Sequence, residues 1–152
     1  MRFYFVDRIT ELNPGKNIFG FKNVSMSEPY FSTHFPSFPV LPGVIIIESM
    51  AQLAGLLIEL SPEGGNNKKK AILSIVDRVK FKKIVRPGDK LEMKAELTVL
   101  DDEGARADVF SSVSNELVAQ TKLTFALLEV PKQFQDLIEK ERQALLLALT
   151  SK

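Results

Sequence analysis

The longest apolar run of the chain covers residues 44–60, where only Glu48, Ser49, Gln52 and Glu59 are polar. A helix that is apolar on nearly every side is expected to be buried in a protein core. A membrane-spanning helix needs ~20 mostly apolar residues. Since this run is shorter and carries two carboxylates, we interpret it as the central helix of a soluble domain without stable membrane insertion.

Shorter apolar segments on both sides of this run have the length and the partial period-2 alternation of strands. Turn sequences at residues 87–89 (Pro-Gly-Asp) and 101–104 separate several of them. This order of elements predicts an α+β domain, in which an antiparallel sheet wraps around one central helix. The predicted strands cover residues 18–24, 71–83, 90–100, 106–114 and 117–129, with a short strand or helical turn at residues 3–9.

A second, amphipathic helix is predicted at residues 133–149, after Pro131. We therefore divide the chain into a domain of residues 1–130 and a C-terminal helical extension of residues 131–152. The simplest role for this extension is packing onto its own subunit or a neighbouring one.

Composition narrows the classes of function. The chain has 152 residues, enough for one domain. Its 20 Lys and Arg residues nearly balance 19 Asp and Glu residues, which argues against nucleic-acid binding. It has no cysteine, so disulfides, thiolate catalysis and Cys-ligated metal sites are excluded. No signal peptide is recognisable at the N-terminus, and a cytoplasmic location is expected.

The only histidine, His34, lies in a segment made stiff by Pro29, Pro36, Pro39 and Pro42. Proline fixes φ and lacks an N–H, so this segment is predicted to form a loop without helix or inner strand. Histidine is the side chain best suited to acid–base chemistry near neutral pH. The loop leads to the start of the central helix at Gly43, where free N–H groups are expected.

Glu48 is the second candidate for chemistry. A carboxylate within a buried helix is costly unless it is paired, and burial raises its pKa toward that of a proton donor. The alternative is that Glu48 lies on a solvated stripe with Gln52 and Glu59. The pattern alone leaves both interpretations open.

Residues 34–44 read His-Phe-Pro-Ser-Phe-Pro-Val-Leu-Pro-Gly-Val, and residues 48–52 read Glu-Ser-Met-Ala-Gln. These two blocks resemble the signature of the FabZ-type (3R)-hydroxyacyl-[acyl-carrier-protein] dehydratases, of the FabA/FabZ-like hotdog family. Residues 79–81 and 85–91 resemble a further block of that family. Three positions depart from the pattern: Thr33 replaces a usual glycine, and Ser37 and Phe38 replace a common Gly-His pair.

The resemblance implies a hotdog fold and a lyase of fatty acid or related lipid biosynthesis that acts on acyl thioesters carried by acyl carrier protein. It implies no metal and no organic cofactor. It also implies a homodimer with shared active sites, sometimes assembled into a trimer of dimers. His34 of one chain would then meet Glu48 of the other, with the Gly43 N–H polarising the thioester carbonyl and the Val40 carbonyl orienting the imidazole.

Two further sets of residues are weaker candidates. Phe35, Phe38, Met50 and Met93 are candidates for an acyl tunnel, although they fit a core equally well. Lys80, Lys82, Lys83 and Arg86 form a basic segment suited to an acidic carrier protein, with an ordinary solvated strand face as the alternative.

Two other functions compete with dehydration. The first is a different hotdog enzyme, either a thioesterase or a coenzyme A-dependent hydratase. The second is a non-catalytic acyl-binding subunit. The presence of both His34 and Glu48 argues against the second, and a thioesterase has no need of the His34 loop.

Overall fold

The computed structural model describes residues 3–64 and 68–151. Residues 1, 2 and 65–67 of the predicted domain and residue 152 of the predicted extension lie outside the described residues. Within these ranges the chain forms six strands, two α-helices and two short 3-10 turns. The elements are β1 (Arg8–Asn13), β2 (Asn17–Asn23), η1 (Pro29–Ser32), α1 (Gly43–Leu60), η2 (Pro62–Gly64), β3 (Lys69–Phe81), β4 (Lys90–Leu100), β5 (Gly104–Val113), β6 (Glu116–Glu129) and α2 (Lys132–Thr150).

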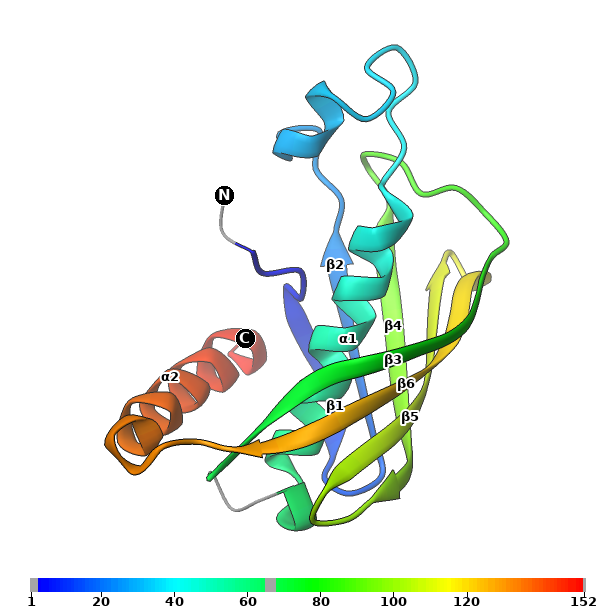
Figure 1. Cartoon of the computed structure of the whole chain (residues 1–152). Coiled ribbons are helices and arrows are strands. Elements are labelled where there is room, and N and C mark those ends of the chain that lie inside the picture. Colours follow the sequence, from blue (N-terminus) through cyan, green and yellow to red (C-terminus); the bar gives the residue numbers. More distant parts are fainter. Residues whose placement is uncertain (1–2, 65–67, 152) are drawn as a thin grey trace.

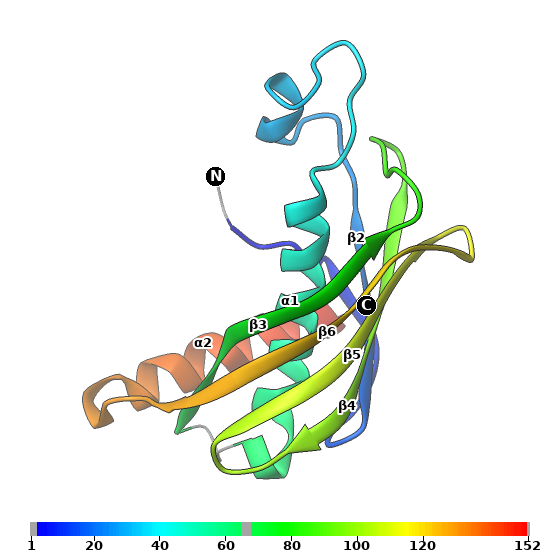
Figure 2. The same cartoon turned by 45° about the vertical axis from the view of Figure 1, so that its right-hand side comes forward.

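The strands form one antiparallel sheet in the order β1-β2-β4-β5-β6-β3. The sheet bends around α1, which runs along its concave side (Figure 1, Figure 2). This is the hotdog fold, as the sequence predicted. The two edge strands, β1 and β3, leave one side of α1 uncovered by the sheet.

The core lies between α1 and the inner face of the sheet. Leu53 and Leu57 of α1 are fully buried, together with alternate residues of the strands such as Leu91 and Ala95. Gly20 of β2 has no room for a side chain, because a Cβ there would lie 3.0 Å from Leu53 Cδ1 of α1 and 2.5 Å from the Arg8 carbonyl oxygen of the neighbouring strand β1. By length and composition α1 could cross a membrane, but 56% of it is buried inside this fold, where it packs against the sheet.

Two local predictions need correction. Residues 3–7 are not part of a strand, and β1 begins only at Arg8, although the Asp7 N–H already donates to the Phe21 carbonyl oxygen of β2 at 2.8 Å. This segment is apolar because Phe5 and Val6 pack into the core, and the Phe5 N–H is satisfied by the side chain of Gln52. The proline-rich loop also contains one helical turn, η1, because Pro29 occupies its first position, where no N–H is required.

The second helix, α2, follows the sheet and lies against its open side (Figure 1). It contacts β1, and its Arg142 reaches Glu59 of α1 and the Lys69 carbonyl oxygen at the start of β3. Leu149 is buried, and the Ser151 carbonyl oxygen accepts a hydrogen bond from Arg8. The extension therefore packs onto its own subunit and bridges the gap between the edge strands.

Candidate active site

The loop between β2 and α1 holds His34 by its backbone and its ring. The His34 N–H donates to the Tyr30 carbonyl oxygen at 2.8 Å. Its Nδ1 lies 2.8 Å from the Val40 carbonyl oxygen. A carbonyl can only accept a hydrogen bond, so a neutral ring must carry its proton on Nδ1 and a lone pair on Nε2. This geometry leaves Nε2 as the atom available to take a proton.

The same loop is strained next to His34 and anchored at its far end. Phe35 has a φ of 54°, a left-handed conformation that costs a residue with a side chain roughly 1–2 kcal/mol. Its ring lies 4.4 Å from the His34 ring. At the far end, the Leu41 N–H donates to the Val85 carbonyl oxygen at 2.8 Å, and the Arg86 guanidinium lies 4.4 Å from the centre of the Phe38 ring.

Helix α1 begins at Gly43. The N–H groups of Ile45 and Ile46 bond to the Pro42 carbonyl oxygen, whereas the first N–H of a helix has no acceptor within it. A Cβ on Gly43 would lie only 2.9 Å from Cζ of Phe81 in β3. A larger residue here would therefore displace the half-exposed Phe81 ring or the start of the helix, whose first N–H groups lie at the positive end of the helix dipole.

Glu48 lies in the second turn of α1 and is half-buried in the single chain. Gln52 Nε2 donates to Glu48 Oε1 at 2.9 Å, while Gln52 Oε1 accepts from the Phe5 N–H at 2.8 Å. The N-terminal segment thus fixes Gln52, and Gln52 in turn fixes the carboxylate of Glu48.

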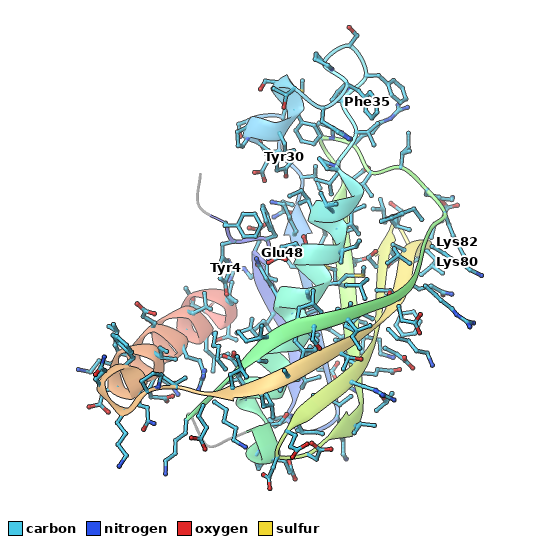
Figure 3. The ribbon with its side chains drawn as sticks, viewed as in Figure 1. Tyr4, Tyr30, Phe35, Glu48, Lys80 and Lys82 are labelled. Atoms are coloured by element: carbon cyan, nitrogen blue, oxygen red, sulfur yellow. The ribbon has the colours of Figure 1, made fainter. Side chains whose placement is uncertain are left out.

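His34 and Glu48 lie apart within one chain. The loop that carries Phe35 projects beyond the N-terminal end of α1, whereas Glu48 points from the side of the helix toward Tyr4 (Figure 3). Among the described residues, the partners recorded for the His34 ring are Val40 and Phe35, and Glu48 bonds to Gln52. One chain therefore presents the His34 imidazole and the Glu48 carboxylate at separate places.

Glu59 does not lie on a solvated stripe. Only 7% of Glu59 is exposed, and its carboxylate bonds to Arg142 Nε at 3.2 Å and to Lys70 Nζ at 3.0 Å. The Ala71 N–H adds a bond of 3.0 Å. Sequence analysis missed this buried cluster. The sequence carries no local signal for it, because Arg142 lies in the polar run Glu139-Lys140-Glu141-Arg142-Gln143, which is typical of a solvated helix face.

The weaker candidates divide between the core and the surface. Met50 and Met93 are nearly fully buried and belong to the core, which was the alternative to a tunnel. Phe35 and Phe38 are exposed on the loop. Lys80 and Lys82 point outward near the end of β3 (Figure 3). Lys83 forms an ion pair with Glu116, and Arg86 lies over the Phe38 ring.

Metal-ligating side chains are not clustered in the described parts of the chain. Within residues 3–64 and 68–151, no group of three or more His, Cys, Asp or Glu side chains is arranged to hold a metal ion. The candidate functional groups of the site are the His34 imidazole, the Glu48 carboxylate and the Gly43 backbone amide.

Comparisons with known proteins assign the chain to a family. The 3-hydroxyacyl-[acyl-carrier-protein] dehydratase FabZ of Clostridioides difficile strain 630 is 44% identical over 127 residues, 84% of this chain and 88% of that protein. The protein of the same name from Bacillus velezensis strain FZB42 is 42% identical over 127 residues, 84% of this chain and 89% of that protein.

The fold is also shared with more distant proteins. A hypothetical thioesterase of Streptococcus pneumoniae TIGR4, solved with coenzyme A, superposes with a TM-score of 0.64 at 14% identity, over 80% of this chain and 85% of that one. At this identity the likeness concerns the fold alone. The family model of the FabA-like domain matches residues 1–122, most of the chain. This protein therefore belongs to the FabA-like family, and its near relatives within that family are the FabZ-type dehydratases.

Proposed function

We propose that this protein removes water from (3R)-3-hydroxyacyl thioesters carried on acyl carrier protein, giving trans-2-enoyl thioesters in fatty acid or related lipid biosynthesis. The observation that carries the proposal is the His34 ring, whose Nδ1 is engaged by the Val40 carbonyl oxygen. This contact prepares Nε2 as a base in a loop whose sequence matches the dehydratase signature. A cytoplasmic location is part of the proposal.

The proposed reaction uses three groups of the chain. The Gly43 N–H binds the thioester carbonyl oxygen and stabilises the negative charge that develops there. His34 Nε2 takes the proton from C2, and the electron pair of that C–H bond forms the C2–C3 double bond. The C3–O bond breaks, and the protonated Glu48 gives its proton to the departing hydroxyl, which leaves as water. Transfer of the proton from His34 back to Glu48 restores the enzyme, without metal or organic cofactor.

We further propose that a homodimer completes each site, because His34 and Glu48 of one chain lie apart. The edge strand β3 supports this arrangement. It exposes Ile72, Ile75 and Val76 at 44%, 55% and 40% of their surface. A long apolar edge strand with unpaired backbone groups is a ready surface for pairing with a second strand. Pairing two copies of β3 about a twofold axis would place two chains side by side, and three such dimers could associate further.

The carrier protein is proposed to dock beside the His34 loop. Lys80 in β3, Lys82 just after it and Arg86 over the Phe38 ring present positive charge where an acidic carrier would approach, whereas the charge of Lys83 is partly offset by its ion pair with Glu116. Complementary charge of this kind mainly raises the association rate, which is sensitive to ionic strength.

The experiment that tests the function supplies 3-hydroxybutyryl and crotonyl thioesters of acyl carrier protein and follows the absorbance of the enoyl product. We expect interconversion in both directions. Release of free thiol without enoyl product would instead assign a thioesterase. Absence of turnover at every chain length would assign an acyl-binding subunit.

A further inference from the structure

A cavity of about 390 Å³ opens beside Glu48, between α1, β3 and α2. Glu48, Gln52, Gly55 and Glu59 lie along its side on α1, at spacings that place them on one face of the helix. Glu48 and Glu59 are eleven residues apart, which is about 16 Å at 1.5 Å per residue. The cavity is therefore an elongated groove that starts at the proposed proton donor.

Between its two glutamates the groove is mostly apolar, and Gln52 beside Glu48 is its polar residue on α1 there. Ala51 and Leu56 of α1, Ala71 and Leu73 of β3, and Phe125 of β6 form its lining. Gly55 contributes no side chain, and a Cβ there would meet only the Phe125 ring, at the ordinary contact distance of 3.9 Å. A side chain would therefore fit at this position, and the glycine leaves that space open in the groove. A narrow apolar groove that begins at the reacting groups suits the hydrocarbon chain of an acyl thioester.

Helix α2 forms the outer wall of this groove. Leu145 lines the cavity, and Tyr4 lies between Glu48 and the C-terminal end of α2 (Figure 3). The far end of the groove is polar, because Glu59 there is held by Lys70 of β3 and by Arg142 of α2, which is only 4% exposed. Hydrocarbon cannot displace a buried ion pair without leaving a charge unpaired, so this cluster is a firm end to the groove.

This wall lies outside the part of the chain that the family shares. The FabA-like match ends at residue 122, whereas α2 covers Lys132–Thr150. A feature that closes the groove here is thus not supplied by the matched domain.

We propose that α2 sets the maximum acyl length of this enzyme. Leu145 is the residue that limits the space, and the Glu59–Arg142–Lys70 cluster holds the helix in place. This inference rests on the proposed dehydratase function, since it assigns the acyl end of the same site.

The test measures kcat/KM over a ladder of acyl-carrier-protein substrates from 3-hydroxybutyryl to 3-hydroxyhexadecanoyl. Leu145→Ala should raise the ratio of long-chain to short-chain kcat/KM by about tenfold or more, since a few methylenes in an apolar site discriminate on that scale. Leu145→Trp should lower the same ratio. Leu147→Ala is the matched control, because Leu147 lies on the same helix and is 70% exposed. It should retain the wild-type profile.

A second variant keeps the test independent of how well α2 tolerates change. Gly55→Ala fills the groove from α1 and, because alanine favours helix, should not impair folding. It should also lower the ratio of long-chain to short-chain kcat/KM.

Unchanged chain-length profiles in the Leu145 and Gly55 variants, with normal turnover of 3-hydroxybutyryl substrate, would overturn the proposed role of α2 but not the proposed function. A shift in dimer affinity without a shift in profile would also overturn it, because a segment of the partner would then occupy the groove. Absence of dehydration by the wild-type protein would instead remove the proposed function.

Discussion

At the scale of single residues, the local contacts of the candidate site define what each group can do. The Val40 carbonyl oxygen fixes the tautomer of His34, and Gln52 fixes the direction of Glu48. The sequence identified these residues because a rigid loop, a lone histidine and a carboxylate in an apolar helix are local patterns. It left the environment of Glu48 open, since the neighbour that fixes Gln52 is Phe5, which is distant in the sequence.

The first prediction concerns the proton-transfer groups. His34→Ala and Glu48→Gln should each lower kcat/KM for 3-hydroxybutyryl-carrier substrate by roughly two orders of magnitude or more, the contribution of a positioned acid or base. Steady-state kinetics measures this effect, and thermal melting monitored by circular dichroism should find both variants folded. Thr33→Ser, on the exposed loop next to His34, is the control and should keep wild-type activity. A His34 variant within tenfold of the wild type would exclude His34 as the base.

The second prediction concerns the start of α1. Gly43→Ala places a methyl group 2.9 Å from Phe81 Cζ, so the ring or the helix start must move. Displacement of a positioned amide by a fraction of an ångström to an ångström costs up to about 100-fold in rate. We expect kcat/KM to fall by about tenfold or more.

The double variant Gly43→Ala with Phe81→Ala isolates the cause of that loss. It removes the ring that the new methyl group meets, so part of the activity should return relative to Gly43→Ala. The single variant Phe81→Ala completes the thermodynamic cycle. Equal losses in the single Gly43 variant and the double variant would show that the contact with Phe81 is not the reason for the glycine.

At the scale of elements, hydrophobic periodicity predicted the central helix, the last helix and five strands with bounds close to those observed. It failed at residues 3–6, because apolar residues that pack into a core without pairing have the same local pattern as a strand. The contact between α2 and α1 was also beyond the sequence. Arg142 and Glu59 are 83 residues apart, and neither position alone indicates a buried ion pair.

The third prediction concerns that ion pair. Arg142→Met leaves Glu59 buried with only Lys70 as a charged partner among the contacts described here. Loss of one member of a buried pair typically costs about 3–5 kcal/mol. We expect the free energy of unfolding to fall by about 3 kcal/mol, measured by urea denaturation at fixed protein concentration. Amide hydrogen exchange should locate the loss of protection in α2.

Two variants complete the test of the ion pair. Lys140→Met removes an exposed charge from the same helix and should change the free energy of unfolding little. The pair Glu59→Leu with Arg142→Met replaces both buried charges by apolar groups and should recover much of the lost stability. An Arg142→Met protein as stable as the wild type would mean that α2 is held by its apolar contacts alone.

At the scale of the whole molecule, a single chain is an incomplete enzyme under the proposed mechanism. Its loop carries the base away from its own Glu48, and its edge strand β3 exposes apolar residues. The sequence could predict this separation only through its resemblance to a family, because periodicity and composition hold no information on contacts between copies. The position of α2 limits the arrangement further, since the helix already covers one end of the open side of α1.

The last prediction follows from sharing of the site between subunits. His34→Ala and Glu48→Gln homodimers should both be nearly inactive, but a mixed dimer combines one mutant site that lacks both groups with one intact site. Random exchange of equal amounts yields half mixed dimers, so about one quarter of wild-type activity should return. Size-exclusion chromatography and native mass spectrometry of differently tagged chains would verify that exchange has occurred.

The variant Ile75→Lys on β3 tests the shared site independently. A buried charge at the paired edge should dissociate the dimer and abolish activity while each chain stays folded. Verified exchange without any return of activity would place both groups of each site in one chain, and full activity of a monomeric Ile75→Lys protein would contradict shared sites independently.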